Sequence, residues 1–447
     1  MKNNKLFKQN KLYYIYSMKL DRILKSFFSL SVLTVLSRAS GFIKVAAIAA
    51  FYGRSVEADM LTAVMVLPDL VYKFLSEGLV SGAAVPIFVN NKDDKTALNE
   101  AFWSIFWITA IVGTILSVAL ALGTNQICAL LMPEIDSGFE LVLRRMWLIL
   151  IPYLVLGLFS GVQTSLLNSR LSFAMPAIGA LLVNLSIITG TFIAAGKSIE
   201  IIAVANTVGA LIQVLWLFIL IYKDKILESG LKSCLAYKSS IAKDYLKASS
   251  PVIAWVSILP LIPVYERHLL SADAGGISTL NYTEKLFNLP LGVIAISLAH
   301  VILPNLSLVK GKERIKFLAK SLSLASIVII PIILVIWFGA DYIVKIVFMR
   351  GKFSLEDVDI AANLFRFYSI ALLPVSLNLI LNRGFFAARS YRIPFVAGLI
   401  AALLQIYLCY STVPSYGMKG IAIAAISAGF TQFIILLVMT IRISNRD

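Results

Sequence analysis

Long apolar segments recur along the whole sequence, and they constrain its fold more than any other feature. Most are close to the ~20 residues that a helix needs to cross a bilayer, and the two longer ones, 59–90 and 277–306, are expected to tilt or bend. Inside hydrocarbon every backbone polar group must be satisfied within its own segment, which favours helices. The sequence therefore predicts an all-α polytopic membrane protein with about twelve transmembrane helices, at 27–51, 59–90, 100–123, 143–167, 171–195, 199–222, 246–270, 277–306, 315–339, 357–382, 393–412 and 419–441.

The basic residues support this topology. The chain has 59% hydrophobic residues and a formal net charge of +16. If the N-terminus is cytoplasmic, most of the 40 lysines and arginines fall in cytoplasmic segments, as the positive-inside rule requires. We therefore expect both termini in the cytoplasm, a multi-pass membrane location, and no nucleic-acid partner.

The two ends of the chain read as cytoplasmic segments. Residues 1–26 are rich in lysine and have no small-residue cleavage site, so they do not resemble a signal peptide. They are either a lead-in with a short amphipathic helix or a basic tail, and either Met1 or Met18 is the start. Residues 442–447 form a short cytoplasmic tail.

An internal repeat divides the chain into two lobes. Three prolines of the first half, Pro86, Pro152 and Pro176, have counterparts about 220 residues later. Six helices per repeat is an even number, so both halves have the same orientation in the membrane. We predict an N-lobe at 27–222, a basic cytoplasmic connector at 223–245 and a C-lobe at 246–441, with the substrate between the lobes.

Charged residues lie within the first two apolar segments. Charges at membrane depth are costly and normally face a bundle interior or a water-filled cavity. We read these residues as lining a polar cavity with a mild positive excess that suits an anionic head group. The alternative is that one of the cations reaches the interface or pairs with an acid. The candidates are Arg38, Lys44, Asp59, Lys73 and Glu77.

Two later segments add polar candidates. Glu266 and Arg267 lie near the outer end of 246–270, where they form either a gate or a structural pair. Asn281, Lys285 and Asn288 share one helical face at the start of the next segment. We expect Lys285 to face the cavity.

Several functions are not supported by the sequence. Three cysteines without metal or CxxC spacing and two histidines predict neither a redox site nor a metal centre. No P-loop, HExxH or GxSxG motif is present. We expect no enzymatic activity and no cofactor.

The motifs SRASGF at Ser37 and LPDLVYKFLSEG at Leu67 resemble the lipid II flippase family of the MurJ/MviN type, in the multidrug/oligosaccharidyl-lipid/polysaccharide exporter superfamily. The resemblance extends weakly over most of the chain. It implies alternating access, with the lipid-linked peptidoglycan precursor moving from the cytoplasmic to the periplasmic leaflet.

The resemblance also implies site residues. In the family, basic residues of helices 1, 2 and 8 surround the pyrophosphate, and an acid after helix 1 is needed. By motif these fall on Arg38, Lys44, Lys73, Lys285 and Asp59. Three of them are lysines where the family has arginine, which keeps the charge but loses the bidentate fork.

The sequence departs from the family in length and near helix 11. Family members have fourteen helices, and the last two form a groove for the lipid tail. We expect either that the tail lies between helices at the bilayer or that the chain is a reduced relative. The acid expected near helix 11 is missing from RSYRIP, which weakens any transfer of a sodium site.

Lipid II flipping is therefore the leading hypothesis, with the membrane potential or an ion gradient as the driving force. Lipid II, membrane lipids and cell-wall synthesis proteins are the expected partners. One alternative is a flippase or exporter of another polyprenyl-linked glycan or amphiphile. The other is a transport-inactive cell-wall scaffold, in which neutralising the embedded cations is harmless.

Overall fold

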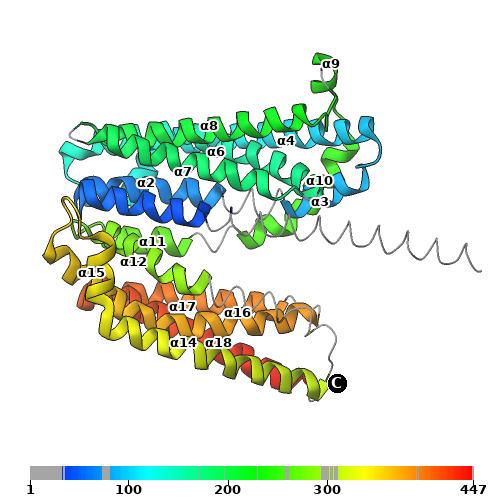
Figure 1. The fold of residues 1–447 in the computed structure, drawn as a ribbon. Helices are drawn as coiled ribbons and strands as arrows, with labels where there is room; N and C mark the ends of the chain where they lie inside the picture. The colour runs from blue at the N-terminus through cyan, green and yellow to red at the C-terminus, as the bar shows by residue number, and fades with distance from the viewer. Residues whose placement is uncertain are drawn as a thin grey trace, which may run out of the picture. The chain divides into compact units, whose positions relative to one another are not determined.

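The structure is a computed structural model of the 447-residue chain. It describes residues 33, 36–72, 81–170, 172–195, 197–228, 230–256, 261–292, 302, 306, 311–388, 390 and 392–444. Throughout these residues the regular structure is helical, as the sequence predicts. Figure 1 shows the helices and their labels.

The chain divides into two compact units that each combine separate stretches of sequence. Unit 1 comprises Met1–Lys44, Pro68–Thr124 and Arg144–Ser257, and unit 2 comprises Val45–Leu67, Asn125–Leu143 and Ile258–Asp447. The helix of residues 36–52, α2 (Val56–Tyr72) and α6 (Ser137–Ser169) each run from one unit into the other. The predicted lobe boundaries stay a prediction.

Unit 1 is built around α4 and the end of α6. Its other helices are α3 (Ser81–Asn90), α7 (Ala174–Ala194), α8 (Glu200–Lys223), α9 (Leu231–Cys234) and α10 (Ser239–Val256), with α4 at Lys95–Leu122. Asp94 begins α4, because its side chain accepts hydrogen bonds from the amides of Thr96 and Ala97, each 3.0 Å long. Buried residues of α3, α4, α6, α8 and α10 form one core. The partly buried Phe159 packs against this core, and its ring stacks on that of Phe106 at 4.5 Å.

Unit 2 contains α5 (Thr124–Leu131), except for Thr124 itself. It also contains the helices of the second half of the chain. These helices are α11 (Leu261–Leu270), α12 (Gly276–Pro290), α14 (Gly311–Phe348), α15 (Leu355–Tyr368), η3 (Ser369–Ala371), α16 (Leu372–Ala387), α17 (Arg392–Tyr416) and α18 (Met418–Ser444). Helix α18 packs against α15, α16 and α17, and α11 packs against α12 and α17. Ser354 and Asp357 form a capping box that begins α15.

The two units repeat one interhelical contact. In unit 1 the Gln163 amide donates to the carbonyl of Val214 at 3.0 Å, and in unit 2 the Asn378 amide donates to the carbonyl of Gly429 at 3.0 Å. In both cases 51 residues separate donor from acceptor. The first contact joins α6 to α8, and the second joins α16 to α18. This equivalence agrees with the internal repeat.

Each predicted apolar segment overlaps one or more helices in the described part of the chain. Eight helices there are long and apolar enough to cross a membrane. The count of twelve stays a prediction. Helix α14 continues to Phe348, nine residues past the predicted end at 339, and only then does the chain turn at Gly351. The charged residues that end the apolar run do not end the helix.

Candidate functional site

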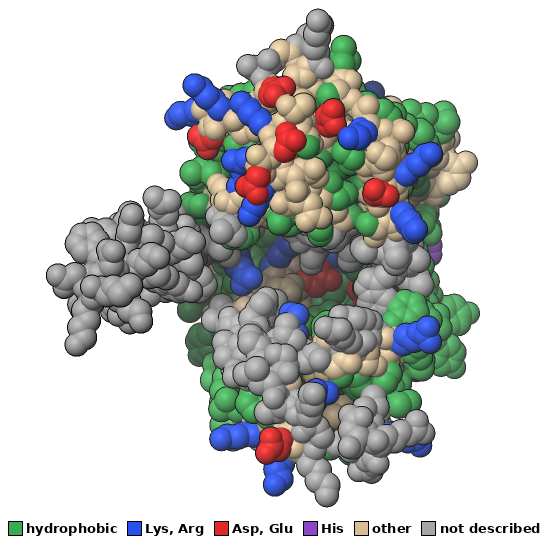
Figure 2. Space-filling view, turned by 90° about the vertical axis from the view of Figure 1, so that its right-hand side faces the viewer, with side chains coloured by type: hydrophobic (Ala, Val, Ile, Leu, Met, Phe, Trp, Pro, Cys, Tyr) green, Lys and Arg blue, Asp and Glu red, His purple; other side chains and the backbone are tan. Residues whose placement is uncertain are grey.

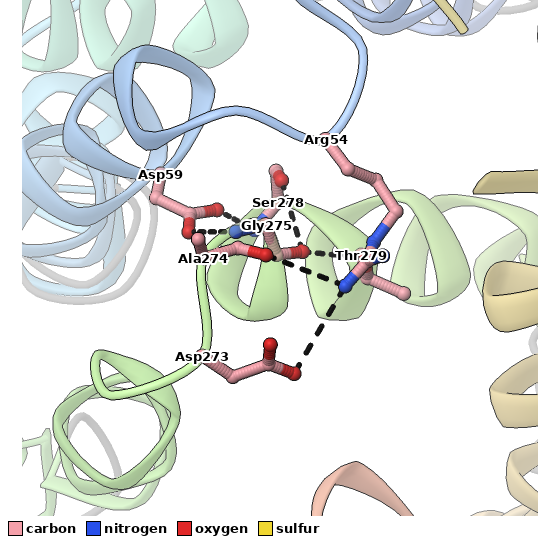
Figure 3. A network of polar contacts seen from close by, with 7 residues as sticks. All are labelled: Arg54, Asp59, Asp273, Ala274, Gly275, Ser278 and Thr279. Atoms are coloured by element: carbon pink, nitrogen blue, oxygen red, sulfur yellow. Dashed lines mark hydrogen bonds and ion pairs between the residues drawn. The ribbon is translucent and has the colours of Figure 1, made fainter. Parts of the chain in front are cut away.

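Asp59 joins the start of α2 to the start of α12. Its carboxylate is buried, with the residue 1% exposed. Oδ2 accepts a hydrogen bond from the Gly275 amide at 2.6 Å, and Oδ1 accepts one from the Ser278 amide at 2.7 Å (Figure 3). These amides belong to the N-terminus of α12, where a negative charge is favoured by the helix dipole. Asp59 therefore caps a helix more than 200 residues away in the sequence.

Arg54 adds a second set of contacts to the same helix start. Its Nε donates to Thr279 Oγ1 at 2.6 Å, its Nη2 lies 3.5 Å from the Ala274 carbonyl, and Nη2 is 3.9 Å from the Asp273 carboxylate (Figure 3). The Tyr282 hydroxyl donates to the Gly53 carbonyl at 2.8 Å. The turn between the helix of residues 36–52 and α2 is thus bonded to α12 through the Arg54 side chain and through the Gly53 carbonyl.

Gly275 makes this close approach feasible. Its φ of 82° lies in the left-handed region, and a Cβ there would come within 2.6 Å of the Arg54 Cβ. The Lys352 amide donates to the Ala50 carbonyl at 2.8 Å, beside Gly351 with φ 57°. The end of the helix of residues 36–52 is therefore also tied to the turn before α15.

A buried charge cluster lies on α11. Arg267 is 3% exposed and donates from Nη2 to Glu284 Oε2 of α12 at 2.7 Å and from Nη1 to the Pro263 carbonyl at 3.1 Å. Glu266 is 2% exposed and accepts a hydrogen bond from the Gln405 amide of α17 at 2.8 Å. The two residues predicted as a gate or a structural pair thus hold α11 to two different helices.

Of the predicted cation set, three members lie within the described residues. Arg38 is exposed and Lys44 half-buried on the helix of residues 36–52, and both belong to unit 1. Lys285 is exposed on α12 in unit 2. Asn184 of α7 steadies the turn that carries Arg38, because its amide donates to Ser40 Oγ at 2.9 Å and to the Ser37 carbonyl at 3.3 Å.

The remaining predicted polar residues divide between described and undescribed parts. Lys73 and Glu77 lie outside the described residues. On α12, Asn281 is half-buried, and the exposed Asn288 donates to the Glu284 carbonyl at 2.7 Å. That Asp59 lines a polar cavity together with these cations also stays a prediction. Both oxygens of Asp59 accept backbone hydrogen bonds in this structure.

The connector lies against α4 in unit 1. Asn99 donates to the Ser233 carbonyl at 3.2 Å, the Ser233 hydroxyl donates back to Asn99 at 2.9 Å, and Trp107 Nε1 donates to the Cys234 carbonyl at 2.8 Å. Figure 2 shows lysine, arginine and acidic side chains gathered on the end of unit 1 that carries α9. The side of the membrane on which the connector lies stays a prediction.

No described residues form a group of three His, Cys, Asp or Glu side chains that could hold a metal ion. Cys128, Cys234 and Cys409 are not joined in disulfides. The contacts of Arg54, Ser278 and Gln405 were missed by sequence reasoning. Only the adjacent Gly275 and Gly276 gave a local signal, because paired glycines favour a turn before a helix.

Comparisons with known proteins agree over most of the chain. A profile of the family described as "Lipid II flippase MurJ" matches residues 48–445. The chain is 29% identical over 436 residues to "Probable lipid II flippase MurJ" of Buchnera aphidicola subsp. Baizongia pistaciae (strain Bp), covering 93% of this chain and 82% of the relative. It is 26% identical over 420 residues to "Lipid II flippase MurJ" of Burkholderia cenocepacia, covering 90% and 80%.

Solved structures show the same fold. "Lipid II flippase MurJ, inward closed conformation" superposes with a TM-score of 0.81 at 22% identity, covering 92% of this chain and 87% of the other. An inward-facing multidrug resistance MATE family transporter of the MOP superfamily gives a TM-score of 0.75 at 12% identity, covering 94% and 99%.

Proposed function

This chain belongs to the lipid II flippase MurJ family, and from that premise we propose how it binds and moves its substrate. The chain is a transporter rather than an enzyme, and it is a multi-pass protein of the inner membrane. It flips lipid II from the cytoplasmic to the periplasmic leaflet by alternating access. The observation that carries this function is the family match over residues 48–445.

Arg38, Lys44, Lys73 and Lys285 bind the pyrophosphate of lipid II. Lysine and arginine recognise phosphate oxygens by charge-assisted hydrogen bonds. The exposure of Arg38 and Lys285 supports this assignment, because a side chain that waits for a ligand must be accessible in at least one state. Glu77 competes with the pyrophosphate for these cations.

Asp59 acts on the site through α12. Its two backbone hydrogen bonds fix the helix start, and Lys285 lies on the same helix. A fixed α12 presents Lys285 in a constant position, which lowers the ordering cost of substrate binding. Glu266, Arg267, Asn281 and Asn288 act as secondary or gating residues.

The orientation and energy source are part of the same proposal. The excess of lysine and arginine in the segments assigned to the cytoplasm supports cytoplasmic termini. The membrane potential or an ion gradient drives the conformational cycle. Cell-wall synthesis proteins are the expected protein partners, since they use the flipped substrate.

A reconstituted flipping assay tests this function. The purified chain is placed in liposomes that contain a fluorescent lipid II, and the labelled lipid reaching the opposite leaflet is quenched with time. We expect flipping by wild type, loss with Arg38→Ala or Lys285→Ala, and wild-type rates with Lys320→Ala, an exposed cation of α14 used as a control.

Substrate class is tested in the same liposomes. Flipping of a different polyprenyl-linked glycan or an amphiphile, with none of lipid II, would identify another exporter. No transport by a folded wild-type chain would favour a cell-wall scaffold.

A further inference from the structure

A groove lies between α4 and α6 of unit 1, and none of its lining residues belongs to the proposed pyrophosphate site. Its volume is about 420 Å³, within the range of roughly 300–1,000 Å³ for small-molecule sites. The two helices contact each other on either side of the groove along their length. A Cβ on Gly113 would come within 2.7 Å of Leu158 Cδ1. Trp147 Nε1 donates to the Leu120 carbonyl at 3.3 Å. The groove is therefore a defined gap in a close helix pair.

The lining of the groove is mainly apolar and open to the surroundings of the chain. Its walls include Val118 and Ala121 of α4 and Ile151 and Val155 of α6. Both helices are long and apolar enough to cross a membrane, and Val118 is 53% exposed. In a membrane such a surface is in contact with lipid tails, which are as apolar as the side chains themselves. The groove therefore suits a hydrocarbon chain.

Ser117 places an unpaired hydroxyl in this apolar lining. The residue is 7% exposed, and its buried Oγ makes no hydrogen bond within the described residues. A serine inside a helix often bonds to the carbonyl four residues earlier, as Ser165 does to Gly161 at 2.7 Å. An unpaired polar group in hydrocarbon is costly. The Ser117 position therefore favours a ligand that brings a hydrogen-bond acceptor into the groove.

Arg145 supplies a cation on the same face of α6. It precedes Leu148 by three residues and Pro152 by seven, so the three side chains share one helical face. Pro152 lines the groove, and Leu148 is 47% exposed. The Arg145 side chain is 59% exposed, and its Nη1 lies 3.8 Å from Glu200, which is too long for a hydrogen bond. Such an exposed ion pair is weak, so the guanidinium remains available to an anionic group.

We propose that this groove binds one diacyl glycerophospholipid of the membrane. One acyl chain lies against Ile151 and Val155. Its ester carbonyl accepts a hydrogen bond from the Ser117 hydroxyl, and Arg145 binds the phosphate. A polyprenyl tail has no ester group and leaves Ser117 unpaired, so the tail of a lipid-linked substrate fits the groove less well. The site requires that the chain spans a membrane, and it is independent of the proposed pyrophosphate site.

Native mass spectrometry of the full chain in detergent with added phosphatidylglycerol tests this site. Ala121→Phe fills the groove and is expected to lose one tightly bound phospholipid that wild type retains. Ala119→Phe, the matched control, changes an exposed alanine of the same helix outside the lining and is expected to retain it. Arg145→Gln is expected to weaken retention about tenfold, as loss of one charge-assisted hydrogen bond does. Lys197→Gln, which removes an exposed cation before α8, is expected to change nothing. Equal retention by Ala121→Phe and Ala119→Phe, or by Arg145→Gln and Lys197→Gln, would overturn the proposal.

Ser117→Ala separates a lipid contact from a structural role. This variant is expected to retain phosphatidylglycerol less well than wild type. After removal of lipid its thermal stability is expected to equal or exceed that of wild type, because an unpaired buried hydroxyl is lost. Lower stability of the lipid-free variant would show that Ser117 has a partner within the protein and would refute the assignment. Displacement of the bound phosphatidylglycerol by undecaprenyl phosphate, and not by a second phospholipid, would identify a polyprenyl tail as the occupant and would also overturn the proposal.

Discussion

Replacing Asp59 with asparagine is predicted to loosen the start of α12. Asparagine has nearly the same shape but only one acceptor, whereas the Asp59 carboxylate accepts from two amides, Gly275 at 2.6 Å and Ser278 at 2.7 Å. In Asp59→Asn the new side-chain NH₂ would face one of these N–H groups. One hydrogen bond is then lost and a buried donor is left without an acceptor.

The expected loss of stability at the start of α12 follows from these two hydrogen bonds. A hydrogen bond to a charged group contributes roughly 1.5–3 kcal/mol, and an unsatisfied buried donor costs about 1–3 kcal/mol. Loss of the negative charge near the helix N-terminus adds up to ~1 kcal/mol. These costs overlap, so we expect Asp59→Asn to destabilise the closed helix start by about 3 kcal/mol, or about 100-fold in its opening equilibrium.

Hydrogen exchange measured by mass spectrometry on the full chain in lipid nanodiscs reads this opening directly. Peptides covering the start of α12 are expected to exchange up to ~100-fold faster in Asp59→Asn than in wild type. Asp273→Asn is the matched control, because Asp273 lies 3.9 Å from Arg54 with 56% of its side chain exposed. A contact this long, with its carboxylate open to water, contributes only ~0–1 kcal/mol.

The reasoning would be refuted if Asp59→Asn and Asp273→Asn changed exchange at α12 equally. It would also fail if exchange rose evenly over the whole chain, since that pattern reports global unfolding. Flipping by Asp59→Asn is expected to fall, because Lys285 is then presented by a mobile helix.

Two further predictions concern unit 1. Gly190→Ala is expected to destabilise the chain by about 1–3 kcal/mol, because the new Cβ would overlap the Ala205 side chain between α7 and α8. Gly339→Ala, whose Cβ would meet nothing within 4 Å, is expected to cost nothing, and equal thermal stability of the two variants would contradict this packing. Asn99→Ala is expected to release the connector and speed alkylation of the half-buried Cys234, with the buried Cys128 as internal reference. An unchanged Cys234 rate would show that the connector does not depend on Asn99.

The helices could be predicted from the sequence because their signal is local. An apolar run near bilayer length needs no knowledge of its neighbours. The extension of α14 to Phe348 was missed because hydropathy falls before the helix ends. Helix geometry continues through Asp341 and Lys345 to Phe348.

The residue types of the site could be predicted from the sequence, but the residues that each of them contacts could not. Asp59 was recognisable as an unusual acid, yet its partners Gly275 and Ser278 are 216 and 219 residues away. The link from Glu266 to Gln405 spans 139 residues. One sequence identifies costly charges, whereas their partners depend on how the helices pack.

Genetic complementation tests whether this chain flips lipid II in a living cell. A bacterium depleted of its own lipid II flippase is supplied with the wild-type chain or with Arg38→Ala, at matched levels in the membrane. We expect wild type to restore growth and Arg38→Ala not to, despite normal insertion. Failure of a correctly inserted wild-type chain would contradict lipid II flipping, and rescue by Arg38→Ala would contradict the assignment of the pyrophosphate site.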